Sequence, residues 1–191
     1  AFYDLQPSWI LPNVGLGVYL SGEQFYVGLG VPELIEYDLS TAPNFEQYIR
    51  EIRHYYVHGG LVWPISTSLK LKPSFLFRTV GWFSRTDPSG NSSFRVAAPS
   101  ELDLDISLLM NDILWVGLSF RTAVEVFSKK TASADSGDIW VAWYAPAGFR
   151  LGMAYDFTVS RLASQSLGSL EIMIGYEFNY RKRGIVTPRY F

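Results

Sequence analysis

The chain has 191 residues, of which 48% are hydrophobic, 16% aromatic and only 18% charged, so it holds ample apolar material for one folded domain. Its net charge of -2 lacks the broad positive field that nucleic-acid binding needs, and we expect no nucleic-acid partner. The lack of cysteine excludes disulfide scaffolds, cysteine-ligated metals and thiol nucleophiles.

Alternation of apolar and polar residues recurs along most of the chain and predicts β-strands. The expected strands lie, in chain order, near residues 14–20, 25–31, 55–63, 69–80, 100–110, 113–121, 139–145, 148–157 and 169–180. The last segment alternates most cleanly, with Leu170, Ile172 and Ile174 on one face and Glu171 on the other. No segment offers the ~20 consecutive apolar residues of a membrane helix.

The connections between these strands alternate between short and long. Short turns are expected at 21–23, 66–68, 111–112 and 146–147, and long loops at 33–53, 81–99, 122–137 and 158–167. Residues 45–52, with apolar residues at helical spacing after Asn44, predict one short helix. Loops 86–99 and 128–138, rich in small polar residues, are expected to be solvated. Short turns at one end and long loops at the other are typical of outer-membrane barrels.

The apolar faces could point into a protein core or outward into lipid, and alternation alone does not decide between them. Lipid is favoured because the apolar faces carry no charge and because aromatic residues such as Trp63 and Trp143 gather towards strand ends. One Lys or Arg facing the bilayer midplane would cost ~2–4 kcal/mol. We therefore predict an all-β fold, an antiparallel up-and-down transmembrane β-barrel of outer-membrane type with about nine strands visible.

The opposite faces would then line the barrel interior, where charges must be paired or wet. The lumen-facing charge candidates are Lys70, Lys72, Arg78, Asp103, Asp105, Arg150, Glu171 and Glu177. If strands 69–80 and 100–110 are neighbours, Arg78 lies near Glu101 and Asp103. We interpret these charges as a ladder that rigidifies the barrel rather than as an ion or substrate path.

The last hairpin allows two registers. Placing Gly148 opposite Asn179 brings Arg150 opposite Glu177, which is favourable. The same register sets Asp156 against Glu171, which is unfavourable, and a slip of two residues would change this pairing.

We expect no catalytic, cofactor or metal site. The pairs Gly15-x-Gly17 and Gly28-x-Gly30 are not followed by a helix with a Lys-Ser/Thr pair, so they do not form a phosphate loop. His54 and His58 would stand about 13–14 Å apart along one strand, too far to bind one metal together. In the basic and aromatic tail 181–191, the terminal Tyr190 and Phe191 are a candidate assembly signal, since outer-membrane barrels commonly end in Phe.

Seven segments together carry a resemblance to a known family. They read, in order, NVGLGVY from residue 13, FYVGLGVP from 25, LKLKPSF from 69, WVGLSFR from 115, GFRLGMAYDF from 148, GSLEIMIGY from 168 and TPRYF from 187. Together these segments resemble the PorP/SprF family of outer-membrane proteins of the Bacteroidota type IX secretion and gliding systems, over most of the chain. Family members are usually longer, with more barrel upstream, and loop 81–99 is longer than is usual for the family.

The resemblance implies a non-enzymatic barrel in the outer membrane of a Gram-negative bacterium, without cofactors. It implies that the barrel anchors or helps to present secreted, adhesin-like cargo by the cargo's carboxyl-terminal domain, together with other type IX secretion components. Residues 1–191 would form a single barrel domain that lacks upstream strands, because a barrel with both termini in the periplasm needs an even number. A passive porin, a barrel enzyme and a soluble ligand-binding barrel are the alternatives.

Overall fold

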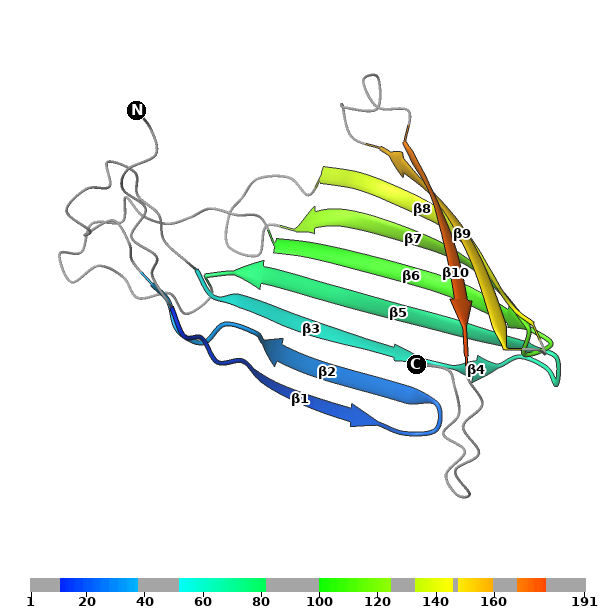
Figure 1. Cartoon of the computed structure of the whole chain (residues 1–191), viewed down its shortest axis with the longest axis horizontal. Helices are drawn as coiled ribbons and strands as arrows, with labels where there is room; N and C mark the ends of the chain where they lie inside the picture. Colours follow the sequence, from blue (N-terminus) through cyan, green and yellow to red (C-terminus); the bar gives the residue numbers. More distant parts are fainter. Residues whose placement is uncertain are drawn as a thin grey trace.

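The protein forms one antiparallel β-sheet (Figure 1). The computed structural model describes residues 11–37, 52–81, 100–124, 133–145, 148–159 and 168–177. The strands are β1 (Leu16–Ser21), β2 (Phe25–Val31), β3 (His54–Leu61), β4 (Trp63–Pro64), β5 (Leu69–Val80), β6 (Ser100–Met110), β7 (Leu114–Val124), β8 (Ser133–Tyr144), β9 (Phe149–Thr158) and β10 (Ser169–Tyr176). All nine predicted strands are present, and the all-β antiparallel class is confirmed.

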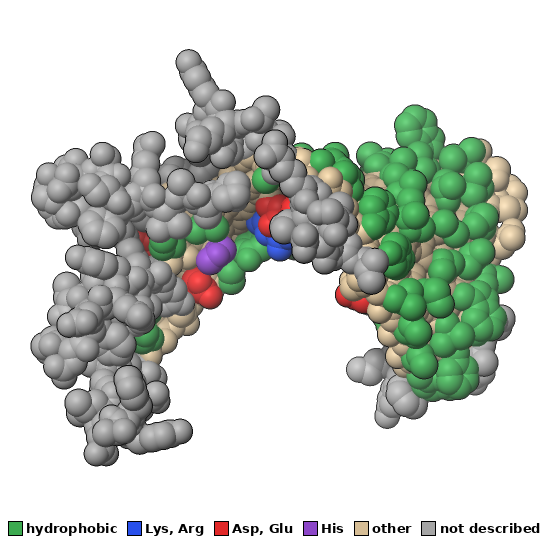
Figure 2. All heavy atoms as spheres, turned by 90° about the horizontal axis from the view of Figure 1, so that it is seen from above, with side chains coloured by type: hydrophobic (Ala, Val, Ile, Leu, Met, Phe, Trp, Pro, Cys, Tyr) green, Lys and Arg blue, Asp and Glu red, His purple; other side chains and the backbone are tan. Residues whose placement is uncertain are grey.

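The strands follow one another in space as they do in the chain. The order is β1-β2-β3-β5-β6-β7-β8-β9-β10, every pairing is antiparallel, and only the two-residue β4 lies off this path, beside β5. The sheet curves into an open arch with β1 and β10 at its two edges, consistent with part of a larger barrel (Figures 1 and 2).

Short and long connections alternate as predicted, with the tight turns at one end of the sheet. Asn111 and Asp112 both have positive φ, 53° and 56°, in the three-residue turn that connects Met110 of β6 to Leu114 of β7. The short helix predicted at 45–52 falls almost entirely outside the described residues, as do loop 86–99 and most of 158–167.

Two predicted boundaries are wrong. The strand predicted at 55–63 breaks at Val62, whose amide donates to the Gln24 carbonyl at 2.6 Å, so Trp63 starts the separate β4. The loop predicted at 122–137 is strand at both ends, because β7 continues to Val124 and β8 already begins at Ser133. A bulge in β8 leaves Asp135 unpaired and shifts the register between Arg121 and Thr122, so that Ala134 pairs with Thr122 and Ser133 with Ala123.

The sheet has an apolar face and a charged face. The apolar face consists of the alternate residues that include Leu118, Met153 and Ile174, and no paired position on it carries Lys, Arg, Asp or Glu. Leu118 is 53% exposed and Ile174 74% exposed, so no described residue covers these rows. Hydrophobic side chains cover the outer surface of the arch, whereas acidic, basic and histidine side chains lie towards the hollow (Figure 2).

Aromatic side chains cover glycines on the charged face. His58 of β3 covers Gly28 of β2, and Trp140 of β8 covers Gly117 of β7, so closely that a Cβ built on either glycine would lie 2.2 Å from the ring. Only a residue without a side chain permits these contacts, and this explains why glycine occurs inside these strands.

We expect Gly117→Ala to lower the free energy of unfolding by about 1–3 kcal/mol, because its methyl group would displace the Trp140 indole. Gly30→Ala is the matched control, since a Cβ there meets nothing within 4 Å on the same face. Urea unfolding of both variants in detergent measures the difference. Equal stability of the two variants would contradict the packing argument.

Candidate functional site: the charged face of the sheet

The residue ladder places seven of the eight candidates singled out from the sequence on the side opposite the apolar rows. The eighth, Glu177, follows the last strand and forms an ion pair with Arg150 of that face. The eight candidates are spread from the long-loop end of the sheet, where Arg78 lies, to the short-turn end, where Arg150 and Glu177 lie. The tail 181–191, with Tyr190 and Phe191, lies outside the described residues.

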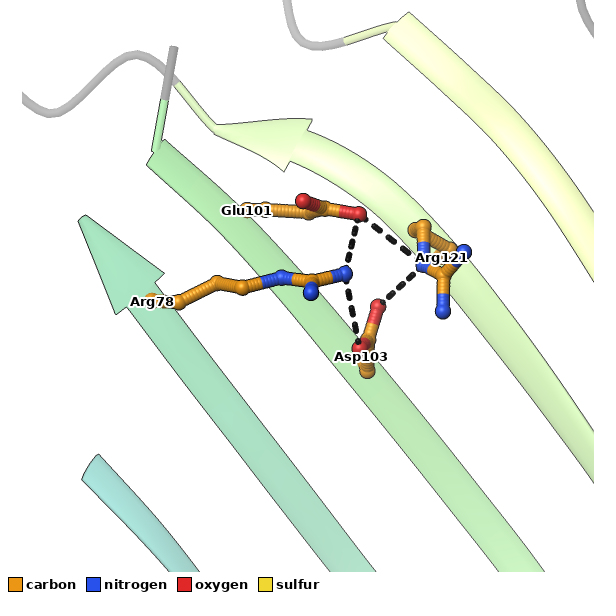
Figure 3. Close-up of polar contacts among 4 residues, drawn as sticks. All are labelled: Arg78, Glu101, Asp103 and Arg121. Atoms are coloured by element: carbon orange, nitrogen blue, oxygen red, sulfur yellow. Dashed lines mark hydrogen bonds and ion pairs between the residues drawn. The ribbon is translucent and has the colours of Figure 1, made fainter. Parts of the chain in front are cut away.

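Four charged side chains form a network across β5, β6 and β7 near the long-loop end (Figure 3). Arg78 Nη2 lies 2.7 Å from Glu101 Oε1 and 3.5 Å from Asp103 Oδ2. Arg121 Nε lies 2.9 Å from the same Glu101 oxygen and 2.8 Å from Asp103 Oδ1. The Arg78 contacts were predicted. The Arg121 contacts were not predicted, although Arg121 alternates with the apolar Leu118 and Phe120 of its strand.

Asp105 is the polar centre of the middle of the face. It accepts hydrogen bonds from Ser119 Oγ at 3.0 Å, from Ser74 Oγ at 3.4 Å and from Trp140 Nε1 at 3.0 Å. Trp140 belongs to β8 and reaches Asp105 of β6 across Gly117 of the intervening β7. These contacts connect four strands through one carboxylate.

Cations meet aromatic rings towards the short-turn end. Lys72 Nζ lies 5.6 Å from the Trp115 ring centre and 5.8 Å from the Tyr26 ring centre, both within cation–π range. Arg150 lies 4.9 Å from the Tyr144 ring centre and also forms an ion pair with Glu177. Cation–π contacts therefore supplement the carboxylate pairs.

An apolar cluster also lies on the charged face, at its short-turn end. Leu109, Trp115 and Ala142 are buried there, with Trp140 and Tyr144 packed against them. This cluster was not predicted, because only the charged residues of these strands were considered as candidates for this face. Leu109 and Trp115 share the charged-face parity of Asp105 and Arg121, and that could have revealed them.

The register predicted for the last hairpin is wrong by two residues. Asp156 pairs with Ser169, and Glu171 pairs with Ala154, so the unfavourable Asp156–Glu171 pairing is absent. The Arg150–Glu177 ion pair still forms, because the long arginine side chain extends past its own partner, Gly175.

The histidines belong to different local clusters. His58 stacks on Tyr19 with 5.8 Å between ring centres, whereas His54 Nδ1 lies 3.8 Å from Glu33. Within the described ranges, no three acidic or histidine side chains are grouped so that they could hold a metal ion. The same residues contain no helix long and apolar enough to cross a membrane.

Chemically, this arrangement neutralises charge within the sheet. Each cation of the Arg78 network touches two carboxylates, so the charges offset one another on a face that is only partly exposed. Such cross-strand pairs stabilise one register of neighbouring strands. This network is therefore close to neutral and cross-links β5, β6 and β7 through their side chains.

We expect Arg121→Gln to destabilise the protein by about 1–3 kcal/mol, because it leaves Glu101 and Asp103 with Arg78 as their remaining network cation. Lys70→Gln is the comparison: Lys70 pairs at 2.5 Å with Asp112, which is 62% exposed, so about 0–1 kcal/mol is expected. Urea unfolding in detergent gives both values, and equal losses would contradict the network.

The comparisons with known proteins agree with the fold. A family model described as type IX secretion system membrane protein PorP/SprF matches residues 1–176. No curated protein and no solved structure matches the chain. The matched range covers all ten strands and both faces of the sheet. The chain belongs to the PorP/SprF family of type IX secretion system membrane proteins.

Proposed function

We propose that the apolar face contacts the lipid of a bacterial outer membrane and that the charged face lines the interior of the barrel. The observation that carries this proposal is the exposure of the apolar rows together with the absence of charge at every paired position of that face. Exposed apolar area of this extent is unfavourable in water, because each buried Å² contributes about 25 cal/mol.

The height of the apolar face fits a bilayer. Ten residue steps separate Leu69 from Thr79 on β5, which at a rise of about 3.3 Å makes about 33 Å along the strand. A tilt of about 40° reduces this to about 25 Å, the height of the apolar band of outer-membrane barrels. Exposed Trp63, Trp143 and Phe149 lie at the short-turn end, where an aromatic girdle is expected.

We further propose that the protein is a non-enzymatic barrel that holds secreted, adhesin-like cargo at the cell surface, working with other type IX secretion components. Family membership supports the secretion role. The long loops all leave the same end of the sheet, opposite the carboxyl end of β10, and this end would face the outside. Loops on that side are the natural contacts for a carboxyl-terminal cargo domain.

A passive porin is the competing function. The ion pairs and the cluster around Trp115 lie along the wall of the sheet, so they are compatible with either function. Conductance of the purified protein in a planar bilayer separates the two functions.

We expect Met153→Arg to cost ~2–4 kcal/mol of stability in lipid vesicles, because Met153 lies at the middle of β9 on the apolar face. Ala154→Arg is the matched control. The neighbouring residue points to the charged face, opposite Glu171, where an added cation is favourable. The folded fraction recovered from vesicles measures both, and equal yields would argue against lipid contact.

We expect deletion of 82–99 or 125–132 to release cargo from the cell surface while the barrel still assembles. These segments connect β5 to β6 and β7 to β8 at the long-loop end, so their removal leaves every described strand intact. Surface retention of cargo and heat-modifiable gel migration of the barrel are the two measurements. Unchanged retention in both deletion variants, with an assembled barrel, would refute anchoring by these loops.

A further inference from the structure

The chain that leaves β2 stays beside the chain that enters β1, beyond the end of their ladder. The last pair of the ladder is Leu16 with Val31. Pro32 follows, and proline has no N–H to donate to a ladder. The backbone contact nevertheless resumes two residues later, where the Leu34 amide donates to the Val14 carbonyl at 2.9 Å. Another interaction must therefore hold the two segments together at this point.

The Asn13 side chain supplies that interaction from the β1 side. Its Nδ2 donates to the Ile35 carbonyl at 3.1 Å, and its Oδ1 accepts from the Ile35 amide at 3.2 Å and from the Val14 amide at 2.8 Å. Further along, the Tyr37 hydroxyl donates to the Pro12 carbonyl. One amide side chain thus satisfies both backbone polar groups of Ile35, as an opposing strand would.

Arg53 holds the same segment from the β3 side. It directly precedes β3, and its carbonyl accepts from the Gly81 amide at 3.0 Å. Its Nη2 donates to the Leu34 carbonyl at 2.8 Å, and its Nη1 donates to the Tyr55 hydroxyl at 3.3 Å. Its backbone amide donates to Glu36 Oε1 at 3.3 Å. The planar guanidinium suits two acceptors at once, so it connects the segment that leaves β2 to β3.

These contacts begin where the ladders stop. The ladders of β2 with β1 and with β3 end at Val31 and Gly30, and none of their bonds uses a side chain. Gly15 lets the two segments come close, because a Cβ there would lie 2.7 Å from the Pro32 carbonyl oxygen. The side-chain bonds are therefore added to ladders that are complete without them.

We propose that Asn13 and Arg53 form a latch that fastens residues 33–37 to the long-loop end of the sheet and fixes the direction in which the chain leaves β2. With the latch closed, the wall formed by β1, β2 and β3 extends past its last ladder pairs. With the latch open, residues 33–37 separate from their neighbours while the strands stay paired. Such local opening is expected where a segment is held by side-chain bonds rather than by a ladder. The latch is independent of the cargo role proposed above.

The test is hydrogen exchange of the intact protein in detergent, followed by NMR at the Leu34 and Ile35 amides. In Asn13→Ala we expect both amides to exchange about tenfold faster than in the wild type, which is the effect of losing hydrogen bonds of this kind. The ladder amides of β2 should keep their protection. Ser66→Ala is the matched control, because it removes an exposed hydroxyl that accepts from the Ser68 amide at the short-turn end, and it should change neither amide.

Arg53→Lys and Arg53→Gln separate the fork of the arginine from its charge. Both variants lose the two-pronged contact, so both should accelerate exchange at Leu34 and Ile35. Wild-type exchange in Arg53→Lys, or unchanged exchange in Asn13→Ala, overturns the latch. Equal acceleration at every β2 amide also overturns it, because the strand itself would then depend on these contacts. If the variants do not assemble, the wild type still decides: exchange at Leu34 and Ile35 as fast as in an unfolded chain contradicts the proposal.

Discussion

The two-residue period of the β-strand is the constraint on which the rest of this structure depends. Successive side chains point to opposite faces, so a slip of one residue would move every charge of a strand to the apolar face. In the described residues no second layer covers the apolar rows. If lipid is the solvent on that side, as we propose, this requirement determines the parity of all nine long strands. The protein is a membrane component of the type IX secretion system.

On the charged face, ionic groups lie close together on a curved surface. In the network of Arg78, Glu101, Asp103 and Arg121, the sign of the charge alternates from strand to strand, so opposite charges are neighbours. Asp105 is stabilised by the three hydrogen bonds that it accepts. Gly117 and Gly28 leave room for the Trp140 and His58 rings to cover the neighbouring strand. The face is thereby tied together laterally, strand to strand, by side chains as well as by the backbone ladder.

Local alternation predicted the strands, and tight turns predicted their antiparallel order. The Arg78–Glu101 contact was also predictable, because a hairpin brings the residues on either side of its loop together whatever the length of that loop. Contacts across more than one strand were not predictable. The Trp140–Asp105 hydrogen bond depends on the gap over Gly117, and the cluster around Leu109 combines residues of three strands. Neither property is encoded in the period of a single strand.

In the last hairpin, the two faces of the sheet determine different properties of the strand pairing. A slip of two residues keeps every apolar side chain on its face, so the apolar rows cannot distinguish the predicted register from the observed one. The charged face distinguishes them. In the predicted register Asp156 would stand between Asp138 and Glu171, three carboxylates in one row, whereas in the observed register it stands between Asp138 and Ser169. The apolar face selects the parity of a strand, and the charges on the opposite face select its alignment.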